Sequence, residues 1–204
     1  QTFQDFAFLI VQDGSSDNTS DILSDYACRD SRIRILTHEK NIGLTKSLNQ
    51  GIGMIDSEYI ARMDADDVSL KNRLKAQFEF LKGHDEYALI GTAWREMSKD
   101  LNRTIRDIRP PVDHSEIAKR ILVKNTFCHS SVMIRRKALL SVGGYNEKMK
   151  YAQDYDLWLR IILSYFVFNI NKMYHIRRIH ENNLRKRNIR AQLTMIARSN
   201  ERFL

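Results

Sequence analysis

The run Asp-Ala-Asp-Asp at residues 64–67 is the part of the sequence whose side chains are best suited to chemistry. Three carboxylates within four residues repel one another, and burial would strengthen that repulsion. A hard divalent cation removes the conflict, and Mg²⁺ or Mn²⁺ bridging carboxylates to substrate phosphates is the usual arrangement. The alternative is a solvated acidic turn in which Asp67 or Ser69 caps the next helix. Because an apolar strand leads directly into the run, we favour the metal site.

A second acidic turn, Gln-Asp-Gly-Ser-Ser-Asp, occupies residues 12–17 after another apolar stretch. The carboxylate of Asp13 is able to accept hydrogen bonds from a base or a ribose, and Gly14 permits a tight turn close to a ligand. A well-capped strand-to-helix turn accounts for the same residues equally well. Both interpretations stay open on this motif alone.

A third acidic segment, with Asp154 and Asp156, opens an apolar helix near the end of the chain. The helix dipole stabilises carboxylates in a first helical turn, so a structural role explains them. A general base at the wall of a cleft is the functional interpretation. The spacing alone favours the structural role.

The charge balance favours an anionic partner. The 204 residues include 33 Lys and Arg against 25 Asp and Glu, for a net charge of +8. Nucleotide phosphates, nucleic acid and an acidic membrane surface all fit such a balance. The run Arg-Arg-Ile-His at residues 177–180 has donors that could grip phosphates, whereas a solvated charged helix is the favoured interpretation of residues 185–187. Only Tyr174 and Phe203 interleave the basic tail with aromatic rings, which argues against nucleic acid.

Apolar strands and amphipathic helices alternate along the first part of the chain. The pattern predicts strands at residues 6–11, 33–36, 59–63 and 87–90, with helices around residues 19–26, 44–52 and 70–81. This alternation is typical of a parallel sheet with crossover helices, which binds ligands at the carboxyl ends of its strands. Both acidic turns fall at such ends. Further on, the pattern predicts helices at residues 113–122, 154–165 and 184–204, an extended segment at 130–134 and a turn at Gly143-Gly144.

Five blocks, taken together and in this order, resemble the family 2 glycosyltransferases, which have the GT-A fold. They are the opening segment at residues 1–6, Asp-Gly-Ser-Ser-Asp-Asn-Thr at 13–19, Asn-Ile-Gly-Leu at 41–44 with Asn-Gln-Gly at 49–51, Tyr-Ile-Ala-Arg-Met-Asp-Ala-Asp-Asp at 59–67, and Gly-Gly-Tyr at 143–145 followed by Gln-Asp-Tyr-Asp-Leu-Trp at 153–158. The resemblance extends to about residue 183 and implies an α/β fold with a mostly parallel central sheet flanked by helices.

The resemblance implies a site for a nucleotide-diphosphate sugar, most often a UDP-sugar, and for Mn²⁺ or Mg²⁺. Asp13 would hold the base of the nucleotide. Asp64 and Asp66 would form the Asp-x-Asp motif, with Asp66 as the direct metal ligand and Asp64 near the ribose and the metal. His180, after Arg178, is similar to a late element that closes over the diphosphate, which makes His180 a third candidate metal ligand and Arg178 a candidate nucleotide-binding residue.

Asp154 would be the general base that deprotonates an acceptor hydroxyl, so that the sugar is transferred with inversion. The resemblance further implies a hexosyltransferase-type enzyme that builds bacterial cell-surface polysaccharide or glycolipid. Its acceptor would be a saccharide or a lipid-linked molecule. We expect it in the cytoplasm, with peripheral contact at the inner face of the cytoplasmic membrane.

The resemblance divides the chain into residues 1–92, which bind the donor, residues 93–183, which bind the acceptor within the same domain, and residues 184–204, a basic helix. It implies that a first strand belongs before Gln1. Two residues depart from the family's pattern. Gln12 and Gln153 stand where acids are frequent, so Asp13 and Asp154 lack an acidic neighbour.

Two other functions fit parts of the sequence. The run at residues 64–68 is also similar to the nucleophile motif of haloacid-dehalogenase-like phosphatases, although the later acidic pair of that family is missing. A non-catalytic domain that binds nucleotides or other anions would account for the charge balance. We favour the transferase, because five blocks match it in order.

Overall fold

The computed structural model describes residues 1–180 of the chain, so the predicted helix at residues 184–204 and residues 181–183 of the predicted acceptor part lie outside the described residues. The elements, in chain order, are β1 (Phe8–Asp13), α1 (Thr19–Arg29), β2 (Ile33–His38), α2 (Leu44–Gly53), β3 (Tyr59–Ala61), β4 (Val68–Ser69), α3 (Arg73–Gly83), β5 (Tyr87–Ser98), β6 (Thr104–Ile108), α4 (His114–Ile121), the 3-10 helix η1 (His129–Ser131), β7 (Met133–Arg135), α5 (Arg136–Ser141), α6 (Gln153–Ile162) and β8 (Phe166–Ile179).

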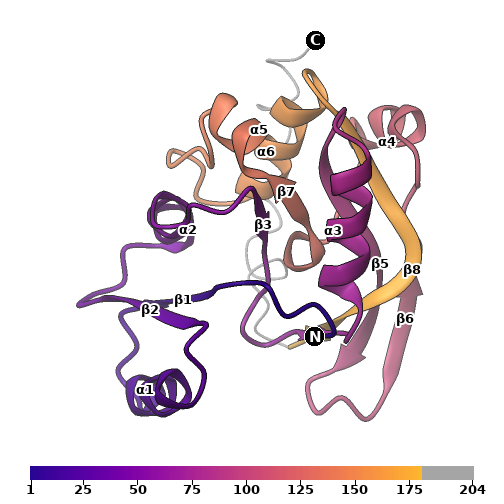
Figure 1. The fold of residues 1–204 in the computed structure, drawn as a ribbon. Coiled ribbons are helices and arrows are strands. Elements are labelled where there is room, and N and C mark those ends of the chain that lie inside the picture. The colour runs from indigo at the N-terminus through magenta and orange to yellow at the C-terminus, as the bar shows by residue number, and fades with distance from the viewer. Residues whose placement is uncertain (181–204) are drawn as a thin grey trace.

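The strands form two sheets. β1 and β2 pair in parallel, from Phe8 opposite Ile33 to Asp13 opposite His38. The larger sheet has the order β3-β7-β5-β8-β4, with β6 paired to the second half of β5. Long β5 and β8 run side by side through its centre (Figure 1). The predicted α/β class is confirmed.

The description of the sheet as mostly parallel is wrong in detail. Only the β1–β2 and β5–β8 ladders are parallel, whereas β3–β7, β5–β7, β4–β8 and β5–β6 are antiparallel. The alternating pattern stops after the fourth strand because β5 returns directly as β6 through a tight turn, in which the Arg103 carbonyl accepts the Ser98 N–H at 2.9 Å. A short hairpin of this kind can only join antiparallel strands.

Helices cover both faces of the larger sheet. Successive residues of a strand point to opposite faces, and Leu89 and Val167 accordingly pack with α4, α5 and α6, while Ile90 and Phe168 pack with α3. Trp158 on α6 is fully buried in the first of these clusters. The central strands therefore lie in a dry interior, and the site is built where strands and turns emerge from it.

Several predicted boundaries shift. The helix predicted at residues 70–81 begins only at Arg73, and its N-cap Asn72 makes no side-chain capping bond, so neither Asp67 nor Ser69 caps it. The predicted extended segment at residues 130–134 starts as η1 and becomes a strand only at Met133. None of the helices formed by residues 1–180 is long and apolar enough to cross a bilayer.

Candidate active site

The acidic turn lies between two strands of the larger sheet. β3 pairs with β7, the Arg62 N–H continues this ladder by donating to the Val132 carbonyl at 3.0 Å, and the chain then turns toward β4. Carboxylate oxygens of Asp64, Asp66 and Asp67 lie within 4.8 Å of one another. The three acids thus converge as the sequence predicts, but their surroundings differ.

Asp67 is buried, and both of its oxygens are already occupied. One accepts the backbone N–H of Arg178 at 2.9 Å, and the other accepts from His175 Nε2 at 3.0 Å and from the Ser130 hydroxyl. Burial raises the pKa of Asp67, but the hydrogen bonds from His175, Ser130 and Arg178 outweigh it and lower the pKa overall. Asp67 therefore fastens the acidic turn to η1 and to the end of β8, and both of its oxygens take part in this attachment.

Asp64 forms an ion pair with Arg62, a buried side chain, and accepts a hydrogen bond from Ser130 at 3.0 Å. Burial raises the pKa of Asp64, but the charge and hydrogen bond of Arg62, together with His129 and Ser130, outweigh it and lower the pKa overall. Nη1 of Arg62 is buried without a hydrogen-bond partner among residues 1–180. A buried guanidinium with a spare donor is a place where an anionic group would be stabilised.

Asp66 is the exposed member of the turn, and one of its oxygens lies 3.0 Å from His180 Nε2. This is a hydrogen-bond distance, and it places a carboxylate oxygen and an imidazole nitrogen, both of them types of metal ligand, beside each other. Asp67 holds the end of β8 in place by accepting the Arg178 N–H. His180, two residues later, is thereby positioned to contact Asp66. Nε of Arg178 is buried without a partner in the described part of the chain.

Asp154 lies in the first turn of α6, as predicted. Its carboxylate accepts a hydrogen bond from Asn125 Nδ2 at 2.8 Å. Burial raises the pKa of Asp154, and this outweighs the lowering by the Tyr155 N–H, Asn125 and the Arg62 charge. A carboxyl group with a raised pKa is better matched to taking up a proton than an ordinary aspartate is.

Arg62 links the acidic turn to Asp154, because its charge acts on the pKa of both Asp64 and Asp154. Burial and the same charge lower the pKa of His129 well below its usual value. His129 is thus a neutral ring, and its Nε2 lies 2.7 Å from the Tyr145 hydroxyl.

Sequence reasoning missed a set of polar residues that complete this site. The sequence contains a signal for one of them only: Arg62 is an arginine inside an otherwise apolar predicted strand. The others lie in loops, in η1 or in β8 and meet their partners only in the folded chain: Asn125, Ser130, Tyr145 and His175.

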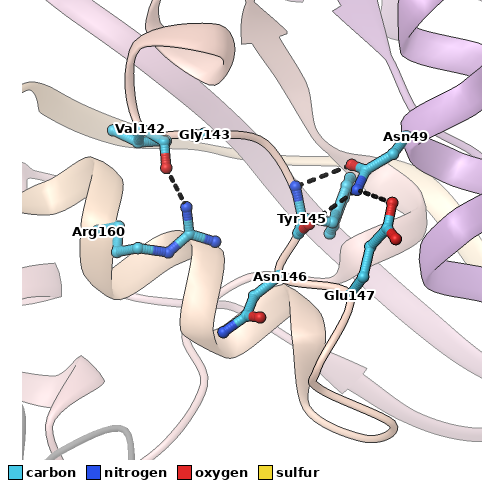
Figure 2. Close-up of a pocket in the computed structure, with 7 residues that line it drawn as sticks. All are labelled: Asn49, Val142, Gly143, Tyr145, Asn146, Glu147 and Arg160. Atoms are coloured by element: carbon cyan, nitrogen blue, oxygen red, sulfur yellow. Dashed lines mark hydrogen bonds between the residues drawn. The ribbon is translucent and has the colours of Figure 1, made fainter.

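A polar pocket beside α2 explains how Tyr145 is held (Figure 2). The Asn49 side chain brackets the Tyr145 backbone, donating to its carbonyl at 2.8 Å and accepting from its N–H at 3.0 Å. Arg160 of α6 donates to the carbonyls of Val142 and Gly144 on the other side of the loop. The pocket is therefore lined by groups that hydrogen-bond to one another. These bonds connect α2 and α6 to the loop at residues 142–147. Gly144, at φ 66°, confirms the turn predicted at Gly143-Gly144.

Asp13 lies at the end of β1, where its carboxylate binds the neighbouring loop. It accepts the N–H groups of Ile42 at 2.9 Å and Gly43 at 3.0 Å, and it lies 2.9 Å from His38 Nδ1. Burial raises its pKa, but these hydrogen bonds outweigh it and lower the pKa.

Within residues 1–180 no hydrogen bond or ion pair joins Asp13 to Arg62 or to the acidic turn. Of the predicted site residues, Asp64, Asp66, Arg178 and His180 are brought together, Asp154 is linked to them through Arg62, and Asp13 organises a loop of its own.

Solved structures with the same architecture define the class of protein. S. aureus TarS in complex with UDP-GlcNAc superposes with a TM-score of 0.75 over 98% of this chain and 59% of its own, at 18% identity. A mannosyltransferase from Pyrobaculum calidifontis, in complex with GDP-Man and Mn²⁺, superposes with a TM-score of 0.67 over 91% of this chain and 51% of its own, at 13% identity. The fold is that of the GT-A glycosyltransferases.

The chain belongs to glycosyl transferase family 2, whose sequence profile matches residues 1–143. The O-antigen biosynthesis glycosyltransferase WbnJ of Escherichia coli is 34% identical over 164 residues, which are 79% of this chain and 62% of WbnJ. The chain spans between 47% and 64% of the length of four curated relatives that it matches. Family membership decides against the phosphatase alternative.

Proposed function

We propose that this chain forms the donor-binding and catalytic centre of an inverting, metal-dependent glycosyltransferase. It would transfer one sugar from a nucleotide-diphosphate donor to an acceptor hydroxyl during synthesis of a cell-surface polysaccharide or glycolipid. The observation that carries the proposal is the acidic turn, in which carboxylate oxygens of Asp64, Asp66 and Asp67 lie within 4.8 Å of one another and Asp64 pairs with the buried Arg62. The charge of Arg62 also acts to lower the pKa of Asp154, so donor and acceptor chemistry would lie near one cation.

The comparisons support the class of donor and the setting. TarS was solved with UDP-GlcNAc, and the mannosyltransferase with GDP-Man and Mn²⁺. WbnJ is named for O-antigen biosynthesis. We infer a nucleotide-diphosphate sugar as donor, with a UDP-sugar as the first choice. A saccharide or lipid-linked acceptor at the cytoplasmic face of the membrane is the setting we propose.

On the donor side, Asp66 and His180 would hold the divalent ion, with Asp64 beside them. When bound, Mn²⁺ or Mg²⁺ supplies positive charge that stabilises the negative charge developing on the departing diphosphate. Arg178 has an unpartnered buried Nε near the same turn, and this donor would add a hydrogen bond to the diphosphate. Asp67 would keep these groups in place without touching the donor.

On the acceptor side, Asp154 would take the proton from the acceptor hydroxyl. The acceptor oxygen then attacks the anomeric carbon, and the bond from that carbon to the diphosphate oxygen breaks on the opposite face. The sugar is transferred with inversion, and the nucleoside diphosphate leaves with the bonding electron pair. Asn125 would orient the carboxylate, and Arg62 would stabilise its charged form before the proton arrives.

The proposed division of the chain needs one refinement. Residues 1–92 contribute Asp66 and residues 93–183 contribute Asp154, which suits donor-binding and acceptor-binding parts. The donor side, however, also uses Arg178 and His180 from β8 and the residue that follows it. We further propose that Asp13 acts on the nucleobase through the loop at residues 41–43, since its oxygens already bind that loop.

Calorimetric titration of the chain with UDP and GDP, with and without Mn²⁺, tests the donor side. We expect binding that requires the metal and weakens at least tenfold in Asp66→Asn, as for the loss of a metal ligand or its close support. Asp17→Asn, in the exposed first acidic turn, is a matched control and should bind as the wild type does. Equal affinity with and without metal would refute the metal assignment. Failure to bind any nucleotide would refute the proposed function.

A further inference from the structure

A basic turn with an aliphatic tip follows α4. The Arg120 carbonyl accepts the N–H groups of Val123 and Lys124, both at 3.0 Å. Residues three and four apart in such a turn lie on the same side, so Val123 and Lys124 share a side with Arg120. The Val123 side chain is 87% exposed, more than any other large apolar residue of the described chain, and Leu122 beside it is 46% exposed.

This turn is attached to the candidate base on both sides. The Tyr155 hydroxyl donates to the carbonyl of Ile121, and Asn125 donates to the carboxylate of Asp154 at 2.8 Å. Ile121 itself is buried in the core, at 1% exposure. The aliphatic tip at Val123 therefore projects from a turn that is fixed at both ends, and one of the two attachments is the carboxylate that would receive the acceptor proton.

The cations of the turn are free to meet an external anion. Lys119, Arg120 and Lys124 are exposed, and none of them forms an ion pair with another residue of the range 1–180. Long cationic side chains around an exposed aliphatic group are the arrangement that binds a lipid interface, with the apolar group among the acyl chains and the cations at the headgroups.

We propose that residues 119–124 dock on an anionic membrane surface, with Val123 entering the headgroup region. Charge complementarity selects this occupant over the alternatives. A nucleic acid would call for exposed aromatic rings among the cations, and residues 119–124 contain none. A stable protein partner would call for a larger apolar patch than two side chains. The inference rests on the proposed function in one respect: an acceptor carried on a lipid explains why the turn adjoins Asp154.

Cosedimentation of the full chain with lipid vesicles tests the proposal without any sugar donor, so its result does not depend on transferase activity. The vesicles are phosphatidylcholine alone and a mixture of phosphatidylcholine and phosphatidylglycerol, at low salt. We expect binding to the mixture only. Lys119→Gln/Lys124→Gln should bind about 25-fold more weakly, because each cation near an anionic surface contributes about fivefold.

Two comparisons separate this surface from general attraction of a basic protein. Lys99→Gln/Arg103→Gln removes the same charge from the exposed turn between β5 and β6, at the other end of the sheet from α4 (Figure 1), and should change binding little. Val123→Trp should show fluorescence quenching by brominated lipids, against the two native tryptophans, which are buried.

Three outcomes would overturn the proposal. An equal loss of vesicle binding in the two double variants would mean that net charge alone attracts the chain to lipid. An unquenched Val123→Trp variant would mean that the tip does not enter the membrane. Loss of binding to a polyuridine probe in Lys119→Gln/Lys124→Gln, with vesicle binding unchanged, would assign the turn to nucleic acid.

Discussion

Asp154 is the residue on which pH should act most directly. A general base works only when it has lost its proton, and burial raises the pKa of this carboxyl above its ordinary value. The transfer rate should therefore rise with pH along a limb that lies above the normal range for aspartate. In Asn125→Ala the carboxylate loses a hydrogen bond that favours its charged form, so the limb should move to higher pH. The pH dependence of kcat checks this, and a shift to lower pH would contradict the assignment.

Asp66 and Asp67 are adjacent, yet they should respond in opposite ways to the same substitution. Asp67→Asn places an amide donor against the N–H of Arg178 or against His175 and Ser130, and should lower the free energy of unfolding by roughly 1–3 kcal/mol. Asp66→Asn changes an exposed side chain and should stay within about 0.5 kcal/mol. Chemical denaturation without metal measures both. Greater destabilisation by Asp66→Asn would contradict the roles assigned to the two acids.

Roles for Asp64 and Asp66 were predicted from the family resemblance, but the role of Asp67 was not. The pattern of residue types alone does not separate the three acids, because the difference between them lies in what each meets after folding. Asp67 meets His175, 108 positions further along the chain. No local spacing encodes such a contact, so the sequence did not distinguish Asp67 as the buried member of the turn.

At the scale of elements, β5 shows why strand ends were misjudged. The strand was predicted at residues 87–90, whereas β5 continues to Ser98 through the charged residues Arg95 and Glu96. In the fold Arg95 pairs with Asp107 on β6 at 2.6 Å, directly across the ladder, and Glu96 pairs with Arg106. Cross-strand ion pairs allow charged residues to extend a strand. The strands and helices before residue 92 were predictable because each follows its own apolar periodicity in the sequence.

The turn after β1 depends on a glycine. Gly14 has φ 72°, and a Cβ added there would come within 3.0 Å of Lys40 Cα and closer still to the Asn41 backbone. Gly14→Ala should therefore destabilise the chain by more than about 1 kcal/mol, and should loosen the loop that Asp13 binds. Gly53→Ala at the end of α2 is the matched control, since nothing lies within 4 Å of its added Cβ.

That control should be neutral or stabilising by about 0.4–1 kcal/mol, because it only restricts the unfolded chain. Thermal melts of the two variants, run side by side, give the comparison. If both glycines tolerated alanine equally, the backbone of the β1 turn would have to differ from the one described.

At the scale of the whole molecule, three partly or fully buried histidines link stability to pH. Burial lowers the pKa of His114, His129 and His175 below the usual 6.5. The unfolded chain then binds more protons than the folded chain below that value, so the free energy of unfolding should fall as pH decreases from 7 toward 5. Asp154, with its raised pKa, has the opposite effect on the free energy of unfolding, but it is one group against the three histidines. Denaturation midpoints across this range measure the effect, and a flat or rising profile on acidification would contradict it.

The whole site draws on segments that the sequence keeps far apart. Arg62 follows β3, Asn125 precedes η1, Asp154 opens α6, and His180 follows β8. The order and type of the five sequence blocks indicated the family. The α/β class followed from the alternation of apolar strands and amphipathic helices. The convergence itself required the antiparallel pairings of β3 with β7 and of β4 with β8, which the alternation of strands and helices did not predict.

The rate of sugar transfer by Asp154→Asn, measured together with donor affinity, tests the central claim most directly. General-base catalysis contributes about 10²–10⁴-fold, so transfer should fall by that factor while the nucleotide sugar binds with unchanged affinity. Asn removes a buried carboxyl with a raised pKa, so the variant should also be at least as stable as the wild type. Transfer within about tenfold of the wild-type rate, in a variant that still binds its donor, would contradict the account.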